Sequence, residues 1–198
     1  SLANNTPDII AAAAKSGQAA NYWSVGDKVG IAVNGSFGGL SYNNTVYAFI
    51  LGFNHNSAKE GTHRIHWQLG KIGGTMVGLC DNQYNSSVSG AGYFHMNDSN
   101  TNVGGWKDSS MRKTLLGNSK TPSSPLANSL MAALPSDLRA VMKSVTKYTD
   151  NTGNGSNSSG NVTATTDYLW LLAEFEVHGS RNYANQYEQN SQAQYAYY

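Results

Sequence analysis

The stretch Thr45-Val-Tyr-Ala-Phe-Ile-Leu-Gly-Phe53 (TVYAFILGF) is the most apolar strand candidate in the sequence. It is built from aromatic and β-branched residues, the types that are enriched in β-strands. A continuous apolar run of this length is typical of a strand that is buried in a core. We therefore predict a buried β-strand over Thr45–Phe53 and place the other elements by working outward from it.

The neighbouring segments predict further strands. Lys28–Val33 alternates between apolar and polar residues, and the Asn34-Gly35 pair after it is a strong hairpin-turn signal. On the other side, Arg64–Leu69 alternates with Ile65 and Trp67 on one face. More strands are predicted at Thr75–Cys80, Val162–Thr166 and Asp167–Leu172.

Helix signals are fewer. Thr6-Pro7-Asp8 supplies an N-cap, a proline at the first helical position and an acidic first turn. A short helix is predicted over Trp106–Leu116, and helical spacing over Leu126–Lys147 is interrupted by Pro135. The sequence therefore predicts an α+β fold in one domain, residues 1–198, with mixed or antiparallel strands and two or three helices. Within it we expect an N-terminal helix in residues 1–20 and a flexible Gly/Asn/Ser loop at 150–161.

Composition excludes several functions. The chain of 198 residues has a net charge of +1 and no basic run, which argues against nucleic acid as a partner. No apolar stretch is long enough to cross a bilayer, so we predict no membrane insertion. Only 13% of residues are charged, about half the usual share. Polarity is carried by Asn, Ser, Thr and Gly, as in many secreted and surface proteins, and we predict an extracellular location.

Three of the five histidines, together with Glu60, lie in one stretch from Gly52 to Trp67. His63 and His66 are three residues apart, and on a strand this spacing points them to opposite faces. Zinc sites need three or four well-placed ligands. We therefore predict a connection between strands with no metal and no cofactor, in which His66 is hydrogen-bonded at the edge of the core.

Glu174 and Glu176 raise the question of catalysis. On a strand they would share one face with their carboxylates about 6–7 Å apart, near the separation of the acid/base pair in a glycoside hydrolase. Such pairs more often accept backbone hydrogen bonds or pair with Arg or Lys. The segment from Glu174 to Val177 either extends the preceding strand or begins a helical turn. We predict no enzymatic activity, with glycoside hydrolysis by this pair as the alternative.

The Trp106…Arg112 segment predicts a structural motif. Ser109 and Ser110 are suited to cap the short helix that carries Arg112. Arg112 would then hold a carboxylate or loop carbonyl groups.

Several segments together carry a resemblance: Gly105-Trp106-x-x-Ser109-x-x-Arg112-x-x-Leu115, Ala133-Leu134-Pro135 and Thr166-Asp167-Tyr-Leu-Trp-Leu-Leu-Ala-Glu174-x-Glu176-Val177. In this order and spacing they resemble a bacterial domain family of unknown function from surface-exposed and prophage-encoded proteins of gut bacteria. Gly52-Phe-Asn-His-Asn56 and Ile65-His-Trp67 resemble a subgroup of it. The resemblance covers nearly all of the chain from Trp23 onward. Its structural signature falls on Trp106, Ser109, Arg112, Asp167 and Glu174.

The resemblance implies a C-type-lectin-like fold, as in formylglycine-generating enzymes and phage tropism proteins. Formylglycine-generating activity needs a reactive cysteine pair, and Cys80 is the single cysteine, so that activity is not carried over. Members of the group commonly end with a Trp-Trp-x-Arg-Ser segment and a closing strand. This sequence reaches Gln194–Tyr198 where that segment would begin. The last strands therefore either lie outside it or are missing from a shortened version of the fold.

Composition and resemblance together predict a noncatalytic recognition module that binds glycan or protein on a cell or virion surface. Tyrosine supplies rigid contact area, and asparagine supplies adaptable hydrogen bonds. A structural spacer domain in a modular surface protein is the remaining alternative. The predicted ligand-binding residues are Tyr84, Tyr93, Asn97, Tyr187, Tyr195, Tyr197 and Tyr198.

Overall fold

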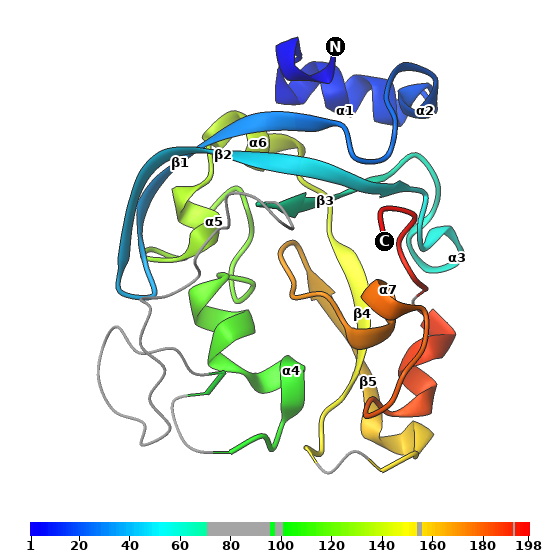
Figure 1. Cartoon of the computed structure of the whole chain (residues 1–198). Coiled ribbons are helices and arrows are strands. Elements are labelled where there is room, and N and C mark those ends of the chain that lie inside the picture. The colour runs from blue at the N-terminus through cyan, green and yellow to red at the C-terminus, as the bar shows by residue number, and fades with distance from the viewer. Residues whose placement is uncertain (71–95, 98–100, 154–155, 192) are drawn as a thin grey trace.

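The predicted buried strand is the middle strand of a three-stranded antiparallel sheet with the order β1-β2-β3. Figure 1 shows this sheet crossing the upper half of the computed structural model, which describes residues 1–70, 96–97, 101–153, 156–191 and 193–198. The predictions for Thr75–Cys80, Tyr84 and Tyr93 lie outside the described residues. The strands are β1 (Lys28–Phe37), β2 (Leu40–Phe53) and β3 (Ile65–Leu69).

The β1–β2 hairpin turns at Gly38-Gly39, so the turn predicted at Asn34-Gly35 is wrong. Both glycines have positive φ, 57° and 77°, as a two-residue type I′ turn requires. Asn34 lies inside the ladder opposite Asn43. Two consecutive glycines adopt positive φ without a steric penalty, whereas Asn-Gly places a side chain at one of the two positions.

One face of the hairpin packs on the apolar core. Val29, Ile31 and Val33 alternate with exposed residues along β1. On β2, Val46, Ala48 and Ile50 share the same face, and the strand is buried on both faces from Ala48 to Gly52. The core is completed by residues from the flanking helical segments, including Leu2, Trp23, Met111, Leu116, Leu130, Met131 and Leu134. Burial of this face stabilises the fold by roughly 1.5–3 kcal/mol for each large side chain.

The helical residues are divided among more and shorter segments than the two or three helices predicted. The N-terminal start is confirmed: Thr6 is the N-cap, Pro7 begins the helix and Asp8 lies in its first turn. Pro135 separates two helices, as predicted. The α-helices are α1 (Pro7–Lys15), α2 (Ala19–Tyr22), α3 (Ser57–Glu60), α4 (Gly105–Asp108), α5 (Leu130–Ala133), α6 (Ser136–Val141) and α7 (Glu174–His178). The remaining helical segments are η1 (Leu2–Asn4), the π-helical η2 (Met111–Leu115), η3 (Ser159–Asn161) and η4 (Gln186–Ser191).

A second antiparallel sheet occupies the lower half of Figure 1 and pairs β4 (Val145–Asp150) with β5 (Val162–Asp167). Helical spacing was predicted to continue to Lys147, but the helix ends at Val141 and Val145 begins β4. Lys147 pairs with Thr165 in this ladder, and both are buried. Pairing with β5 supplies the backbone partners that favour a strand over a further helical turn.

The predicted strand Asp167–Leu172 ends at its first residue, and residues 168–172 are irregular. The side chain of Asn118 takes the place of a strand partner. Its Oδ1 accepts the N–H groups of Tyr168 and Leu169 at 2.9 and 3.2 Å, and its Nδ2 donates to the Leu169 carbonyl at 2.6 Å. An apolar run can therefore be held in the fold without a ladder.

The loop predicted to be flexible over 150–161 is held down in its described parts. The Asn185 amide donates to Asp150 Oδ2 at 2.9 Å and to the carbonyls of Ser156 and Ser158 at 2.7 and 2.9 Å. Asn185 is itself buried, with 1% of its surface exposed. A single amide thus joins both ends of the loop to the segment before η4.

Two of the predicted signature residues, Trp106 and Arg112, donate hydrogen bonds to the carboxylate of a third, Asp167, which is fully buried. Trp106 Nε1 donates to it at 2.9 Å and Arg112 Nε at 2.6 Å. Ser109 Oγ accepts the Arg112 N–H at 3.1 Å, as predicted, whereas Ser110, the N-cap of η2, makes no side-chain cap hydrogen bond. Arg112 also donates to the carbonyls of Lys107 and Thr166, so it holds both a carboxylate and carbonyl groups. These contacts join α4 and η2 to the end of β5.

We expect Asp167→Asn to lower the free energy of unfolding by about 3 kcal/mol, because Arg112 would keep a largely buried charge without its partner. Urea denaturation followed by circular dichroism measures this change. The control is Asp108→Asn, which removes an exposed carboxylate paired with Lys113 and should leave the midpoint unchanged. Equal midpoints for wild type and Asp167→Asn would contradict the assigned role.

Candidate binding surface

The face of the three-stranded sheet opposite the apolar core is exposed along much of its length. We call it the outer face: the alternate positions Lys28, Gly30, Ala32 and Asn34 on β1, Thr45, Tyr47 and Phe49 on β2, and Gln68 on β3. Tyr47 is 45% exposed at its centre. It lies opposite Gly30, where an added Cβ would approach Thr45 Cγ2 at 3.0 Å and the Tyr47 ring at 4.0 Å. The absence of a side chain at Gly30 leaves the ring open on the side that faces this residue.

The C-terminal segment Gln194–Tyr198 covers one end of the outer face. In Figure 1 the C-terminus lies beside α3. Tyr197 approaches Phe49 with 6.4 Å between the ring centroids, and Phe49 is only 6% exposed although it shares the face of Tyr47. Tyr198 donates its hydroxyl hydrogen to Gln68 Oε1 at 2.6 Å. The two terminal rings meet edge to face at 5.2 Å.

A cation lies where the covered and exposed parts of the outer face meet. Lys28 Nζ is 4.4 Å from the centre of the Tyr47 ring and 5.8 Å from that of Phe49. Lys28, Gly30, Thr45, Tyr47, Gln68, Tyr197 and Tyr198 together form what we call the binding surface. It combines half-exposed aromatic rings, amide and hydroxyl groups and one positive charge.

The segment is attached to the body of the protein through Tyr195, which is 1% exposed. Its hydroxyl lies 2.9 Å from His66 Nδ1, and its ring stacks on His55 at 3.7 Å between centroids. Its backbone N–H donates to the Glu176 carbonyl at 2.9 Å. Two residues later, the Tyr197 N–H donates to the Leu51 carbonyl at 3.1 Å. Burial raises the pKa of the Tyr195 hydroxyl, which therefore stays protonated and able to donate.

His66 continues this chain of hydrogen bonds to Glu60. Its Nε2 lies 2.9 Å from Glu60 Oε2, and both side chains are nearly buried. Glu60 Oε1 also accepts the Thr146 N–H at 3.1 Å, which ties α3 to β4. Burial opposes ionisation of Glu60, but the His66 hydrogen bond and charge and the Thr146 N–H outweigh it and lower the pKa of this carboxyl group. The predicted place of His66, hydrogen-bonded at the edge of the core, is confirmed.

A buried ion pair lies beside this chain. Lys147 Nζ donates to Glu176 Oε1, and their side chains are 7% and 1% exposed. The ammonium group also lies 4.6 Å from the centre of the Trp170 ring. Burial lowers the pKa of Lys147, and the neighbouring carboxylate of Glu176 opposes this effect. The pair joins β4 to α7 and supports the carbonyl that holds Tyr195.

Glu174 and Glu176 do not form the strand-borne pair that a glycoside hydrolase would require. Both lie in α7, where residues two apart point in different directions. Glu176 Oε2 accepts the Ala173 N–H at 2.8 Å, and Glu174 accepts the N–H groups of residues 182, 183 and 184 at 2.9–3.3 Å. These hydrogen bonds lower the pKa of Glu174, the N–H of Tyr183 contributing most. Both carboxylates organise backbone.

The structure separates the predicted ligand-binding residues that it describes. Tyr197 and Tyr198 lie together on the binding surface, each half-buried. Tyr195 is buried between two histidines and is inaccessible at the surface, because its ring anchors the segment. Asn97 donates to the Thr101 carbonyl at 2.6 Å, and Tyr187 lies in η4, which packs against β4. We leave Asn97, Tyr187 and Tyr195 out of the binding surface.

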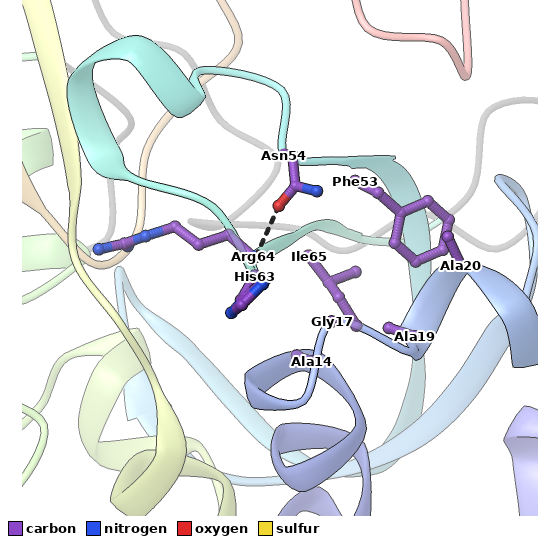
Figure 2. Close-up of a pocket in the computed structure, with 9 residues that line it drawn as sticks. All are labelled: Ala14, Gly17, Ala19, Ala20, Phe53, Asn54, His63, Arg64 and Ile65. Atoms are coloured by element: carbon purple, nitrogen blue, oxygen red, sulfur yellow. Dashed lines mark hydrogen bonds between the residues drawn. The ribbon is translucent and has the colours of Figure 1, made fainter.

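A small hollow of about 220 Å³ opens between the α1–α2 connection and the segment before β3 (Figure 2). Asn54 Oδ1 accepts the Arg64 N–H at 3.1 Å along its wall. The His63 ring lies against Gly17, 3.0 Å from where a Cβ would stand. The other lining residues are small or apolar apart from Arg64, and the lining holds no carboxylate. Its lining residues are Ala14, Gly17, Ala19, Ala20, Phe53, Asn54, His63, Arg64 and Ile65.

Two absences concern the part of the chain that the structure describes. Within it, no group of three or more His, Cys, Asp or Glu side chains is placed to hold a metal ion. Within the same residues, none of the helices has the length and apolar character that a membrane span requires.

Comparison of the chain with protein-family models, curated proteins and solved structures found no match.

Tyr47 and Lys28 were not among the predicted ligand-binding residues, although the sequence pattern places Tyr47 on the outer face. Along Thr45–Phe53 the residues Val46, Ala48 and Ile50 share one face, so Tyr47 must lie on the other. Pairing with Gly30, which exposes the ring, depends on the hairpin register and hence on the position of the turn. The misplaced turn therefore concealed the surface.

We expect Glu60→Gln to reduce stability at pH 7 by about 1.5 kcal/mol, the typical contribution of a hydrogen bond to a charged group. Folding lowers the pKa of Glu60 below its ordinary value of 4.5. The ionised carboxylate therefore stabilises the fold at pH values above 4.5. This contribution is lost as the pH falls through the folded pKa. Urea unfolding between pH 7 and pH 3 should give curves for wild type and variant that converge below pH 4.5. A constant difference across this range would contradict the assignment.

Proposed function

We propose that the chain is a noncatalytic recognition module that binds carbohydrate through the binding surface. The observation that carries the proposal is the half-exposed ring of Tyr47, flanked by Gly30 and Thr45 and continued by Tyr197 and Tyr198. The face of a tyrosine ring packs well against the C–H face of a pyranose. The hydroxyl of Tyr198 and the amide of Gln68 lie at the same surface and suit the hydroxyl groups of a sugar.

The composition of the outer face favours carbohydrate over protein as the ligand. A stable protein interface buries about 800 Å² on each partner around an apolar centre. Along the exposed part of the outer face, Tyr47 is the large apolar side chain, and its neighbours are Gly30, Ala32, Asn34 and Thr45. Small and polar residues leave the sheet open for a ligand that makes hydrogen bonds along its length.

We also propose a relation to C-type-lectin-like domains and an extracellular location. A relation to C-type-lectin-like domains is supported by the convergence of Trp106, Ser109, Arg112 and Asp167, which the resemblance to the gut-bacterial surface and prophage family marked as a unit. An extracellular location on a cell or virion surface is supported by the low share of charged residues, 13%. A noncatalytic role is supported by the use of Glu174 and Glu176 as backbone acceptors.

A glycan array probed with wild type, Tyr47→Ala and Tyr183→Ala tests the proposal. Tyr183 is a suitable control because it is 88% exposed in the loop after α7, where Glu174 accepts its N–H. We expect Tyr47→Ala to weaken binding by about tenfold or more, equivalent to about 1.4 kcal/mol, and Tyr183→Ala to leave it unchanged.

Two outcomes would overturn the proposal. Equal binding by wild type and Tyr47→Ala would place the site elsewhere on the chain. An array without binding by any of the three proteins would favour the spacer role. Capture of a host surface protein that depends on Tyr47 would keep the surface but change the class of ligand to protein.

A further inference from the structure

The C-terminal segment depends on one buried aromatic stack. The Tyr195 ring lies on His55 with centroids 3.7 Å apart and an angle of 20°, and its hydroxyl meets His66. The same segment places Tyr197 over Phe49 and Tyr198 against Gln68. Whatever loosens Tyr195 therefore also moves the two exposed tyrosines.

His55 occupies an environment that suits only its neutral form. Its Nε2 is buried and has no hydrogen-bond partner. Protonation there would create a charged N–H donor with no acceptor, at a high cost in free energy. Trp170 Nε1, in the ring that His66 contacts at 5.5 Å, is also buried and unpartnered.

The titratable groups around His55 come from four elements and the terminal segment. His66 on β3 and Lys147 on β4 disfavour a positive charge, and Glu60 on α3 favours it. Glu176 on α7 pairs with Lys147, and Tyr195 on the terminal segment is neutral. Desolvation is the largest effect, and together with His66 and Lys147 it lowers the pKa of His55 from 6.5 to about 4.

We infer that Gln194–Tyr198 is an acid-sensitive latch on the binding surface, closed by neutral His55 stacked on Tyr195 and opened when His55 takes up a proton. Opening removes Tyr197 from Phe49 and from the Leu51 carbonyl, and it removes Tyr198 from Gln68. The covered end of the outer face is then exposed. The consequence for ligand binding rests on the proposed function, whereas the latch itself does not.

The sign of the effect follows from linkage. A histidine whose pKa is lower in the closed state than in the open state favours opening as the pH falls from 6.5 towards 4. Each unit of pKa difference between the two states changes the equilibrium constant for opening tenfold. This constant therefore rises by up to about 300-fold over this pH range. At pH 7 both states hold His55 neutral and the latch is closed.

Amide hydrogen exchange without ligand tests the latch, with labelling times scaled for the pH dependence of chemical exchange. The reporters are the N–H groups of Tyr195 and Tyr197, which donate to Glu176 and Leu51. In wild type we expect their exchange to accelerate by up to about 300-fold between pH 7 and pH 4, while β1 and β2 stay protected. His55→Phe keeps a ring against Tyr195 but cannot titrate, and it should remove most of this acceleration.

Two further variants complete the design. His178→Gln removes an exposed histidine at the end of α7 and should behave like wild type. Tyr195→Phe keeps the stack on His55 but loses the hydrogen bond to His66, so it should open at a higher pH than wild type. This variant tests the latch even where His55→Phe fails to fold.

The inference is overturned if His55→Phe shows the same acceleration of amide exchange as wild type. It is also overturned if Tyr195→Phe opens at the same pH as wild type. Loss of protection in the segment and in β1–β2 at the same pH would also overturn it, because that result is global unfolding. Glycan binding measured on the same samples separates the two proposals. A latch that opens without any change in binding leaves the latch in place and removes Tyr197 and Tyr198 from the binding surface.

Discussion

The buried ion pair between Lys147 and Glu176 is the contact on which the arrangement of this protein depends. It joins β4 to α7, and the backbone carbonyl of Glu176 accepts the N–H of Tyr195. The gain from such a pair is offset by the cost of removing both charges from water, so the intact pair adds little net stability. Removal of either partner would leave a buried charge uncompensated, which is strongly destabilising.

Two different kinds of contact hold the two parts of the fold. The three-stranded sheet packs on an apolar core, whereas the β4–β5 hairpin turns Lys147, Thr165 and Asp167 inward. Side chains hydrogen-bond the irregular backbone near this hairpin. Asn118 bonds residues 168 and 169, and Glu174 accepts the N–H groups of residues 182–184. Asn185 donates to the carbonyls of residues 156 and 158. A chain with 39% hydrophobic residues thereby orders loops that apolar packing alone would not hold.

The elements governed by hydrophobic pattern and by helix-capping rules were predictable, whereas the hairpin turn was wrongly predicted at Asn34-Gly35. The strand at Thr45–Phe53, the helix start at Thr6-Pro7-Asp8 and the cap at Ser109 follow from local rules and are present. The irregular course of residues 168–172 was not predictable, because a distant side chain, Asn118, satisfies their backbone. Of the predicted ligand-binding residues, Tyr197 and Tyr198 lie on the proposed binding surface. The burial of Tyr195 was not predictable, because it depends on His55 and His66, which are far away in the sequence.

The register shift in β2 between Ile50 and Gly52 gives Leu51 a role that its apolar side chain does not suggest. The ladder pairs Ile50 with Trp67 and Gly52 with His66, so Leu51 is the extra residue of a β-bulge. Its carbonyl is therefore free for Tyr197. Loss of this one codon would restore an unbroken ladder with the same flanking pairs, but it would remove the carbonyl group that accepts the Tyr197 N–H. Among descendants of this sequence, changes of length should accumulate in the loops and be absent from the middle of β2.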